Sequence, residues 1–207
     1  VIAEQFGTLD ALFPGRIDLG VGRAPGTDQR TLRALRRDPT SADTFPQDVL
    51  ELQALLGPVQ ADQVIQAVPG AGSNVPIWIL GSSLFGAQLA AALRLPYAFA
   101  SHFAPAQMEE AIALYRRRFQ PSEQLDRPYV MLGYNVFAAD TDAEARLLAT
   151  SMQQAFVNLR TGKPGKLQPP VEGYAESLEP AARAMLQETL SCTAIGSPET
   201  VRRELAA

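Results

Sequence analysis

The sequence predicts an α/β fold of the (β/α)8 TIM-barrel type that is incomplete in this chain. Short apolar runs alternate with helical patterns at the spacing of βαβ units, which favours a parallel sheet covered by helices. Only about four strands are recognisable, whereas a closed eight-stranded barrel usually takes about 250 residues. We therefore expect residues 1–207 to form one partial barrel domain.

The first elements follow this alternation. The first 13 residues predict a helix that ends at a Pro-Gly pair, with its larger apolar residues on one face: Ile2, Phe6, Leu9 and Phe13. Arg16–Gly22 is short and apolar and predicts a strand. Asp28 is expected to cap the next helix. Pro46 suits the first turn of a further helix, which ends at Gly57.

The uncharged stretch from Val75 to Leu93 approaches the length of a membrane span. Proline, glycine and serine residues interrupt it, and such breaks are costly in lipid. We interpret it as a strand at Ile77–Leu80, a turn and a helix. The later elements alternate in the same way: a strand at Tyr97–Ala100, a helix opened by Pro105, a strand at Tyr129–Ala138, and helices at Ala143–Leu159 and Ala181–Leu190.

Two further segments are marked by glycine, proline and serine. Residues 161–180 are rich in Gly and Pro and predict a mobile loop. Ser197 is expected to cap a last helix, with Pro198 at its first position and Glu199 favoured by the helix dipole.

Composition excludes several classes of function. Lys+Arg 18 against Asp+Glu 22 gives a net charge of −4, which argues against a nucleic-acid surface. Cys192 and His102 are the only cysteine and histidine, so an intrachain disulfide, a cysteine zinc site and a histidine-rich metal site are excluded. No signal-peptide pattern is present, and we expect a cytoplasmic protein without a membrane segment.

Two features suggest a phosphate site. Gly81-Ser82-Ser83 lies between a strand and a helix, where backbone N–H groups and hydroxyls can hold a phosphate; an ordinary serine cap is the alternative. Arg23 follows the carboxyl end of the Arg16–Gly22 strand, the end at which ligands bind in parallel α/β folds. A surface salt bridge is the alternative for this arginine.

The lone histidine also follows a strand. His102 lies just beyond the carboxyl end of the predicted strand Tyr97–Ala100, after Ser101, and this position favours a functional role, although a single histidine is more often a packed or surface residue.

Four stretches in order resemble the bacterial luciferase-like, flavin-dependent monooxygenases, and are closest to a subgroup of uncharacterised luciferase-like oxidoreductases. Phe13–Asp28 is similar to that family's fourth barrel strand and loop, and Pro76–Ser83 to its fifth strand and phosphate turn. Leu95–Phe103 is similar to the sixth strand, and Gly196–Glu199 to the helix start before the last strand. The resemblance implies a (β/α)8 barrel whose first three strands and last strand lie outside this chain.

The resemblance also implies which residues hold the cofactor. Carried over by position, Arg23, Ser82 and Ser83 would contact the phosphate of FMN, while the backbone at Leu80 and Gly81 would run beside the isoalloxazine ring. His102 would be a pocket wall or a proton-transfer residue, and no metal is implied. Gly86 stands where many relatives have a serine or threonine that touches the phosphate.

The implied activity is a monooxygenation that uses reduced FMN and O₂ on a small organic substrate. A separate flavin reductase would supply the reduced FMN, and the protein would form a homodimer. Two alternatives stay open: a hydride-transfer oxidoreductase that uses the deazaflavin F420, and a non-catalytic flavin-binding or structural remnant.

Overall fold

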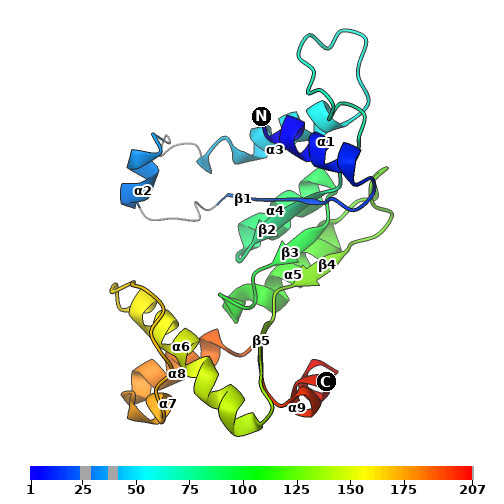
Figure 1. Cartoon of the computed structure of the whole chain (residues 1–207). Helices are drawn as coiled ribbons and strands as arrows, with labels where there is room; N and C mark the ends of the chain where they lie inside the picture. The colour runs from blue at the N-terminus through cyan, green and yellow to red at the C-terminus, as the bar shows by residue number, and fades with distance from the viewer. Residues whose placement is uncertain (24–28, 37–41, 207) are drawn as a thin grey trace. The chain divides into compact units, whose positions relative to one another are not determined.

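The computed structural model describes residues 1–23, 29–36 and 42–206 (Figure 1). The chain divides into two compact units. Unit 1 comprises Val1–Phe99 and Glu109–Met131, and unit 2 comprises Ala100–Met108 and Leu132–Ala207.

Unit 1 contains a four-stranded sheet in the order β1-β2-β3-β4. The strands are β1 (Leu19–Gly22), β2 (Ile77–Gly81), β3 (Tyr97–Phe99) and β4 (Val130–Leu132). The helices are α1 (Ile2–Leu12), α2 (Gln29–Ala34), α3 (Phe45–Leu56), α4 (Leu84–Leu93) and α5 (Met108–Arg118). Because β2 pairs in parallel with both β1 and β3, the predicted α/β fold with a parallel sheet is confirmed.

The two faces of this sheet differ in burial. One face is apolar and buried, with α4 packed on β2 and β3; it carries Leu19, Ile77, Ile79, Tyr97 and Phe99. The opposite face carries Gly20, Gly22 and Leu80, which are exposed. The alternation follows from the period of two along a strand.

The first helix packs through a different face from the one the sequence predicts. Its buried residues are Ala3 and Gly7, while Ile2, Leu9 and Phe13 stay 48%, 40% and 49% exposed. A Cβ on Gly7 would lie only 2.1 Å from the Cα of Gly70, so the missing side chain allows the close approach. The small residues therefore select the contact face.

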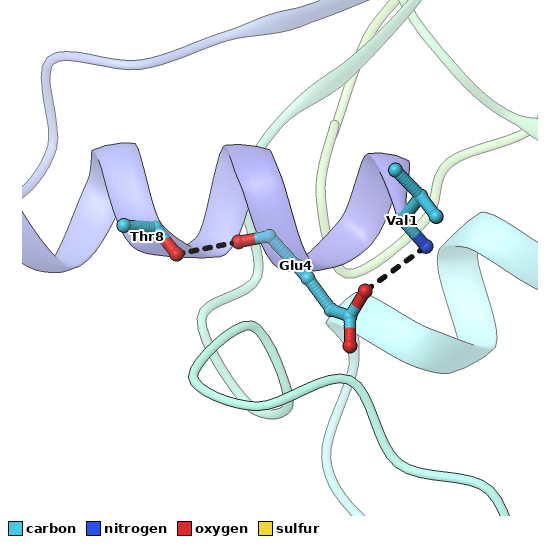
Figure 2. A network of polar contacts seen from close by, with 3 residues as sticks. All are labelled: Val1, Glu4 and Thr8. Carbon is cyan, nitrogen blue, oxygen red and sulfur yellow. Dashed lines mark hydrogen bonds and ion pairs between the residues drawn. The ribbon is translucent and has the colours of Figure 1, made fainter.

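The start of α1 is polar and exposed. The Val1 amino group lies 3.1 Å from the Glu4 carboxylate, and the Thr8 hydroxyl donates to the Glu4 carbonyl at 2.7 Å; both contacts are drawn in Figure 2. Exposed ion pairs of this kind add little stability.

Unit 2 is built around a pair of parallel strands, β5 (Asn135–Ala138) and β6 (Thr193–Gly196). Both α6 and α9 pack against this pair. The helices are η2 (Pro105–Gln107), α6 (Asp142–Arg160), α7 (Tyr174–Ser177), α8 (Pro180–Thr189) and α9 (Pro198–Leu205).

Two strand predictions need correction. The single strand expected at Tyr129–Ala138 is two strands in different sheets, β4 and β5, separated at Gly133 and Tyr134. The Gly133 carbonyl there accepts a hydrogen bond from the Ser101 hydroxyl at 2.6 Å instead of continuing a ladder. The strand β6 was not expected from the sequence, so the described residues contain more strands than the four expected.

Other expectations are confirmed. The uncharged stretch forms β2, a turn and α4, and within the described ranges no helix combines the length and apolar character needed to cross a bilayer. Ser197 caps α9 by accepting from the Thr200 N–H, with Pro198 at the first position.

The segment 161–180 includes the short helix α7, and its mobility stays a prediction. The proposed cap Asp28 lies outside the described residues.

The carboxylate of Asp142 joins the starts of α6 and α9. It accepts hydrogen bonds from the Ser197 N–H at 2.6 Å and from the Thr200 hydroxyl at 3.2 Å. Gly196 allows this approach, since a Cβ there would lie 2.8 Å from an Asp142 carboxylate oxygen. These hydrogen bonds lower the pKa of Asp142 below its ordinary value. The Ser197 N–H has the larger effect and the Thr200 hydroxyl the next.

We predict that Asp142 contributes to acid sensitivity. The pKa of Asp142 is lowered in the folded protein. Its carboxylate therefore stabilises the fold above the ordinary pKa of an unfolded aspartate, about 4, and this stabilisation is lost as the pH falls through the lowered pKa. The melting temperature of Asp142→Asn should lie below that of the native protein at pH 7, and the gap should shrink towards pH 3. Asp140→Asn is the control and should show no such pH-dependent gap. A gap for Asp142→Asn that stays constant with pH would contradict this role.

Candidate phosphate-binding site

Parallel pairing brings the end of β1 beside the end of β2. Gly22, the last residue of β1, is in register with Leu80, and Gly81 completes β2. Arg23 follows Gly22 directly and is exposed, with its guanidinium carbon 4.0 Å from the centre of the Phe85 ring. Phe85 belongs to the first turn of α4, so the guanidinium lies at the start of this helix. Stacking on an aromatic face is a favourable arrangement for arginine.

The start of α4 differs from two other capped helices of the chain. Ser83 is its N-cap in extended backbone conformation, yet its side chain makes no capping hydrogen bond. Thr141 and Ser197, the N-caps of α6 and α9, both accept from a backbone N–H of the first turn. The side chain of Ser83 therefore does not form an ordinary serine cap in this structure. The first-turn N–H groups of α4 keep their capacity to donate to another acceptor.

Charge at this helix start favours an anion. All residues of α4 are described, and its first turn carries no acidic side chain, whereas α6 and α9 have Asp142, Glu144 and Glu199 in theirs. The partial positive charge of a helix N-terminus attracts anions. A guanidinium, backbone N–H groups and two half-buried serines, Ser82 and Ser83, form a donor set that fits a phosphate group.

A buried tyrosine makes a hydrogen bond to the Gly-Ser-Ser turn. Tyr97, at the start of β3, donates its hydroxyl hydrogen to the Ser83 carbonyl at 3.1 Å. A Cβ on Gly86 would lie 3.1 Å from Cε2 of this ring and 3.4 Å from its hydroxyl oxygen. The ring therefore occupies the space that a larger residue at position 86 would need. Burial raises the pKa of Tyr97 to about 12, so the hydroxyl keeps its proton at neutral pH.

On the exposed face of the sheet next to the site, the side chain of Leu80 lies beside the glycines of β1. Leu80 is 42% exposed, and its Cδ1 lies 3.0 Å from where a Cβ on Gly20 would stand. A flat ligand on this face would therefore contact the Leu80 side chain as well as the glycine backbone. This arrangement suits an apolar ring system.

The structure brings together five of the predicted site residues in unit 1: Arg23, Leu80, Gly81, Ser82 and Ser83. The sixth, His102, belongs to unit 2. Its side chain is exposed and lies so close to Gly133 that a Cβ there would be 1.9 Å from its Nδ1. The His102 carbonyl accepts from the Asn135 amide at 2.7 Å, which fixes the backbone of this loop.

Sequence reasoning missed two residues of the site, Phe85 and Tyr97. Phe85 lies two residues after Ser83, so its place in the first helical turn could have marked it as a neighbour of the Gly-Ser-Ser turn. The role of Tyr97 depends on the pairing of β3 with β2, 14 residues from Ser83 along the chain, and no local pattern signals it. Across the described ranges, no cluster of three or more His, Cys, Asp or Glu side chains could hold a metal ion.

Comparisons with known proteins agree over the whole chain. A family model described as luciferase-like monooxygenase matches residues 1–207. The chain is 52% identical to the uncharacterized protein YvbT of Bacillus subtilis (strain 168) and 50% identical to a luciferase-like monooxygenase of Escherichia coli (strain K12). Each alignment covers 99% of this chain and 61% or 62% of the relative. The chain thus spans about three fifths of the length of these relatives.

Solved structures share the fold. Apo-MsnO8 matches with a TM-score of 0.76 at 31% identity, over 99% of this chain and 62% of its own. An F420-dependent secondary alcohol dehydrogenase, bound to an F420-acetone adduct, matches with a TM-score of 0.62 at 18% identity, over 99% and 64%. The oxygenating constituent of 3,6-diketocamphane monooxygenase from Pseudomonas putida, in complex with FMN, matches with a TM-score of 0.59 at 16% identity. This match covers 98% of this chain and 63% of that protein's chain. At these lower identities the last two show the fold alone.

Proposed function

The chain belongs to the luciferase-like monooxygenase family, and from this membership we propose that it holds the cofactor phosphate in a monooxygenase that uses reduced FMN and O₂ on a small organic substrate. The observation that carries the proposal is the Arg23 guanidinium at the start of α4, whose N-cap serine makes no side-chain cap. A fixed positive charge and a helix N-terminus together suit a phosphate dianion.

Each residue of the site has a part in this proposal. Arg23 and the first-turn N–H groups of α4 bind the phosphate, with the hydroxyls of Ser82 and Ser83 as further donors. The strand end at Leu80 and Gly81 lines the ring of the flavin. When bound, the reduced flavin supplies the electrons for the reaction with O₂. The protein's own contribution is to bind and orient the cofactor and to exclude water from it.

We also propose that the strands of this chain belong to a (β/α)8 barrel in the whole protein. The α/β fold with parallel strands and the greater length of the relatives support this. A homodimer and a separate flavin reductase are part of the same proposal, as is a role for His102 as a pocket wall or proton-transfer group.

A second candidate is hydride transfer with the deazaflavin F420. It is favoured by the likeness of the fold to the F420-dependent secondary alcohol dehydrogenase. The proposed phosphate site does not distinguish between the two candidates, because it would bind the anionic tail of the cofactor and not its ring.

We predict that Arg23→Ala weakens binding of FMN by about 1–3 kcal/mol, roughly 5- to 150-fold in Kd, because a charge-assisted contact is lost. Riboflavin, which lacks the phosphate, should bind both proteins equally. The measurement is a fluorescence titration of the full-length protein with each flavin. Arg117→Ala, on an exposed position of α5, is the matched control and should leave both constants unchanged. An unchanged Kd of Arg23→Ala for FMN would remove this arginine from the site.

A competition experiment distinguishes the two cofactors. The full-length protein is incubated with equal amounts of FMN and F420, separated from free cofactor by gel filtration and then denatured. Absorbance and mass identify the released cofactor, and we expect FMN. Release of mainly F420 would contradict the monooxygenase proposal and favour hydride transfer.

A further inference from the structure

The tyrosine beneath the proposed phosphate site is held rigidly. Tyr97 is fully buried and its ring packs against Tyr115, with the ring centres 5.7 Å apart. The hydroxyl of Tyr115 has a different partner from that of Tyr97 and donates to the Leu95 carbonyl at 2.9 Å. The Tyr97 ring also approaches Gly81 and Gly86, where added Cβ atoms would lie 3.6 Å and 3.4 Å from its hydroxyl oxygen. The position of the hydroxyl is thus restricted by packing against Tyr115 and these two glycines.

The hydroxyl bonds to the peptide group that begins the helix. Its acceptor is the carbonyl of Ser83, the N-cap of α4. The peptide unit is planar and trans, so the Ser83 C=O and the Leu84 N–H point in opposite directions from one rigid plane. A contact that fixes the carbonyl therefore also fixes the direction of the Leu84 N–H, one of the first-turn donors of the helix.

The Ser83 side chain does not fix this peptide, because it makes no capping hydrogen bond. Tyr97 fixes it by donating to the Ser83 carbonyl, a bond that does not occupy the Leu84 N–H. Glycine at position 86 gives the ring room, since a Cβ there would lie only 3.1 Å from its Cε2. Tyr97 and Gly86 therefore act as a pair: the glycine gives space to the ring, and the ring's hydroxyl holds the turn.

We propose that Tyr97 is a positioning residue for the cofactor phosphate, which orients the Leu84 N–H through the Ser83 carbonyl. This inference rests on the proposed function, because it assumes that a phosphate binds at the start of α4. It assigns a role in phosphate recognition to a residue that is buried in the core and does not touch the ligand. Since the hydroxyl keeps its proton at neutral pH, the orientation is maintained over the working range.

The test separates phosphate positioning from core packing. Tyr97→Phe keeps the ring and removes the hydroxyl, and the ratio of riboflavin Kd to FMN Kd is measured by titration of the full-length protein. We expect this ratio to fall roughly 3- to 10-fold through weaker FMN binding, with the riboflavin Kd unchanged. Tyr115→Phe is the matched control: it removes the hydroxyl of the neighbouring buried tyrosine, which bonds Leu95 and Tyr129 and not the turn. Its ratio should equal that of the native protein.

The outcomes distinguish this inference from the proposed function. If the native protein binds riboflavin as tightly as FMN, the phosphate site itself is wrong. If the native protein prefers FMN and Tyr97→Phe keeps that preference, or loses affinity for both flavins equally, the positioning role is overturned and the phosphate site stands. If Tyr97→Phe does not fold, Gly86→Ala replaces it. The added methyl must displace the ring by a few tenths of an ångström, and an unchanged ratio for that variant overturns the role.

Discussion

The parallel register of β1 and β2 decides where the charged and polar groups of the candidate site lie. Pairing Gly22 with Leu80 ends the two strands at the same edge of the sheet. Arg23 and the Gly-Ser-Ser turn therefore meet there, although almost sixty residues separate them in the sequence. A slip of one residue would turn the side chains of β1 to the opposite faces. The buried Leu19 opposes such a slip, because its side chain would leave the core.

The site combines an exposed cation with a rigid backbone. Arg23 is exposed and stacks on Phe85, so its position depends on a surface contact. The backbone of the turn depends on the core, through the buried Tyr97. This division suits a binding site, since the preformed N–H donors need no reordering when an anion arrives. The Tyr97 ring also limits which residues fit at position 86, because it leaves little space for a side chain there.

Sequence patterns predicted the local features of the fold and failed where distant contacts decide. The strand, turn and helix from Ile77 onwards, and the Ser197-Pro198 helix start, are encoded within a few neighbouring residues and are confirmed. The apolar face expected for α1 is exposed because the small residues Ala3 and Gly7 approach a distant loop more closely. The break at Gly133 was missed because it depends on Ser101, 32 residues earlier.

The same distinction holds within the candidate site. Arg23, Ser82 and Ser83 could be selected from residue type and from their place after apolar strands. The stacking of Arg23 on Phe85 and the bond from Tyr97 to Ser83 required the register of three strands, which periodicity alone does not give. The missing side-chain cap at Ser83 was also beyond sequence reasoning, because an N-cap serine usually makes one.

A crystal structure of the full-length protein with FMN would show where the phosphate binds. We expect the phosphate within hydrogen-bond distance of the Arg23 guanidinium and of the N–H groups at the start of α4. A phosphate bound at another place, with the guanidinium facing solvent and the Gly-Ser-Ser turn free of ligand, would contradict it.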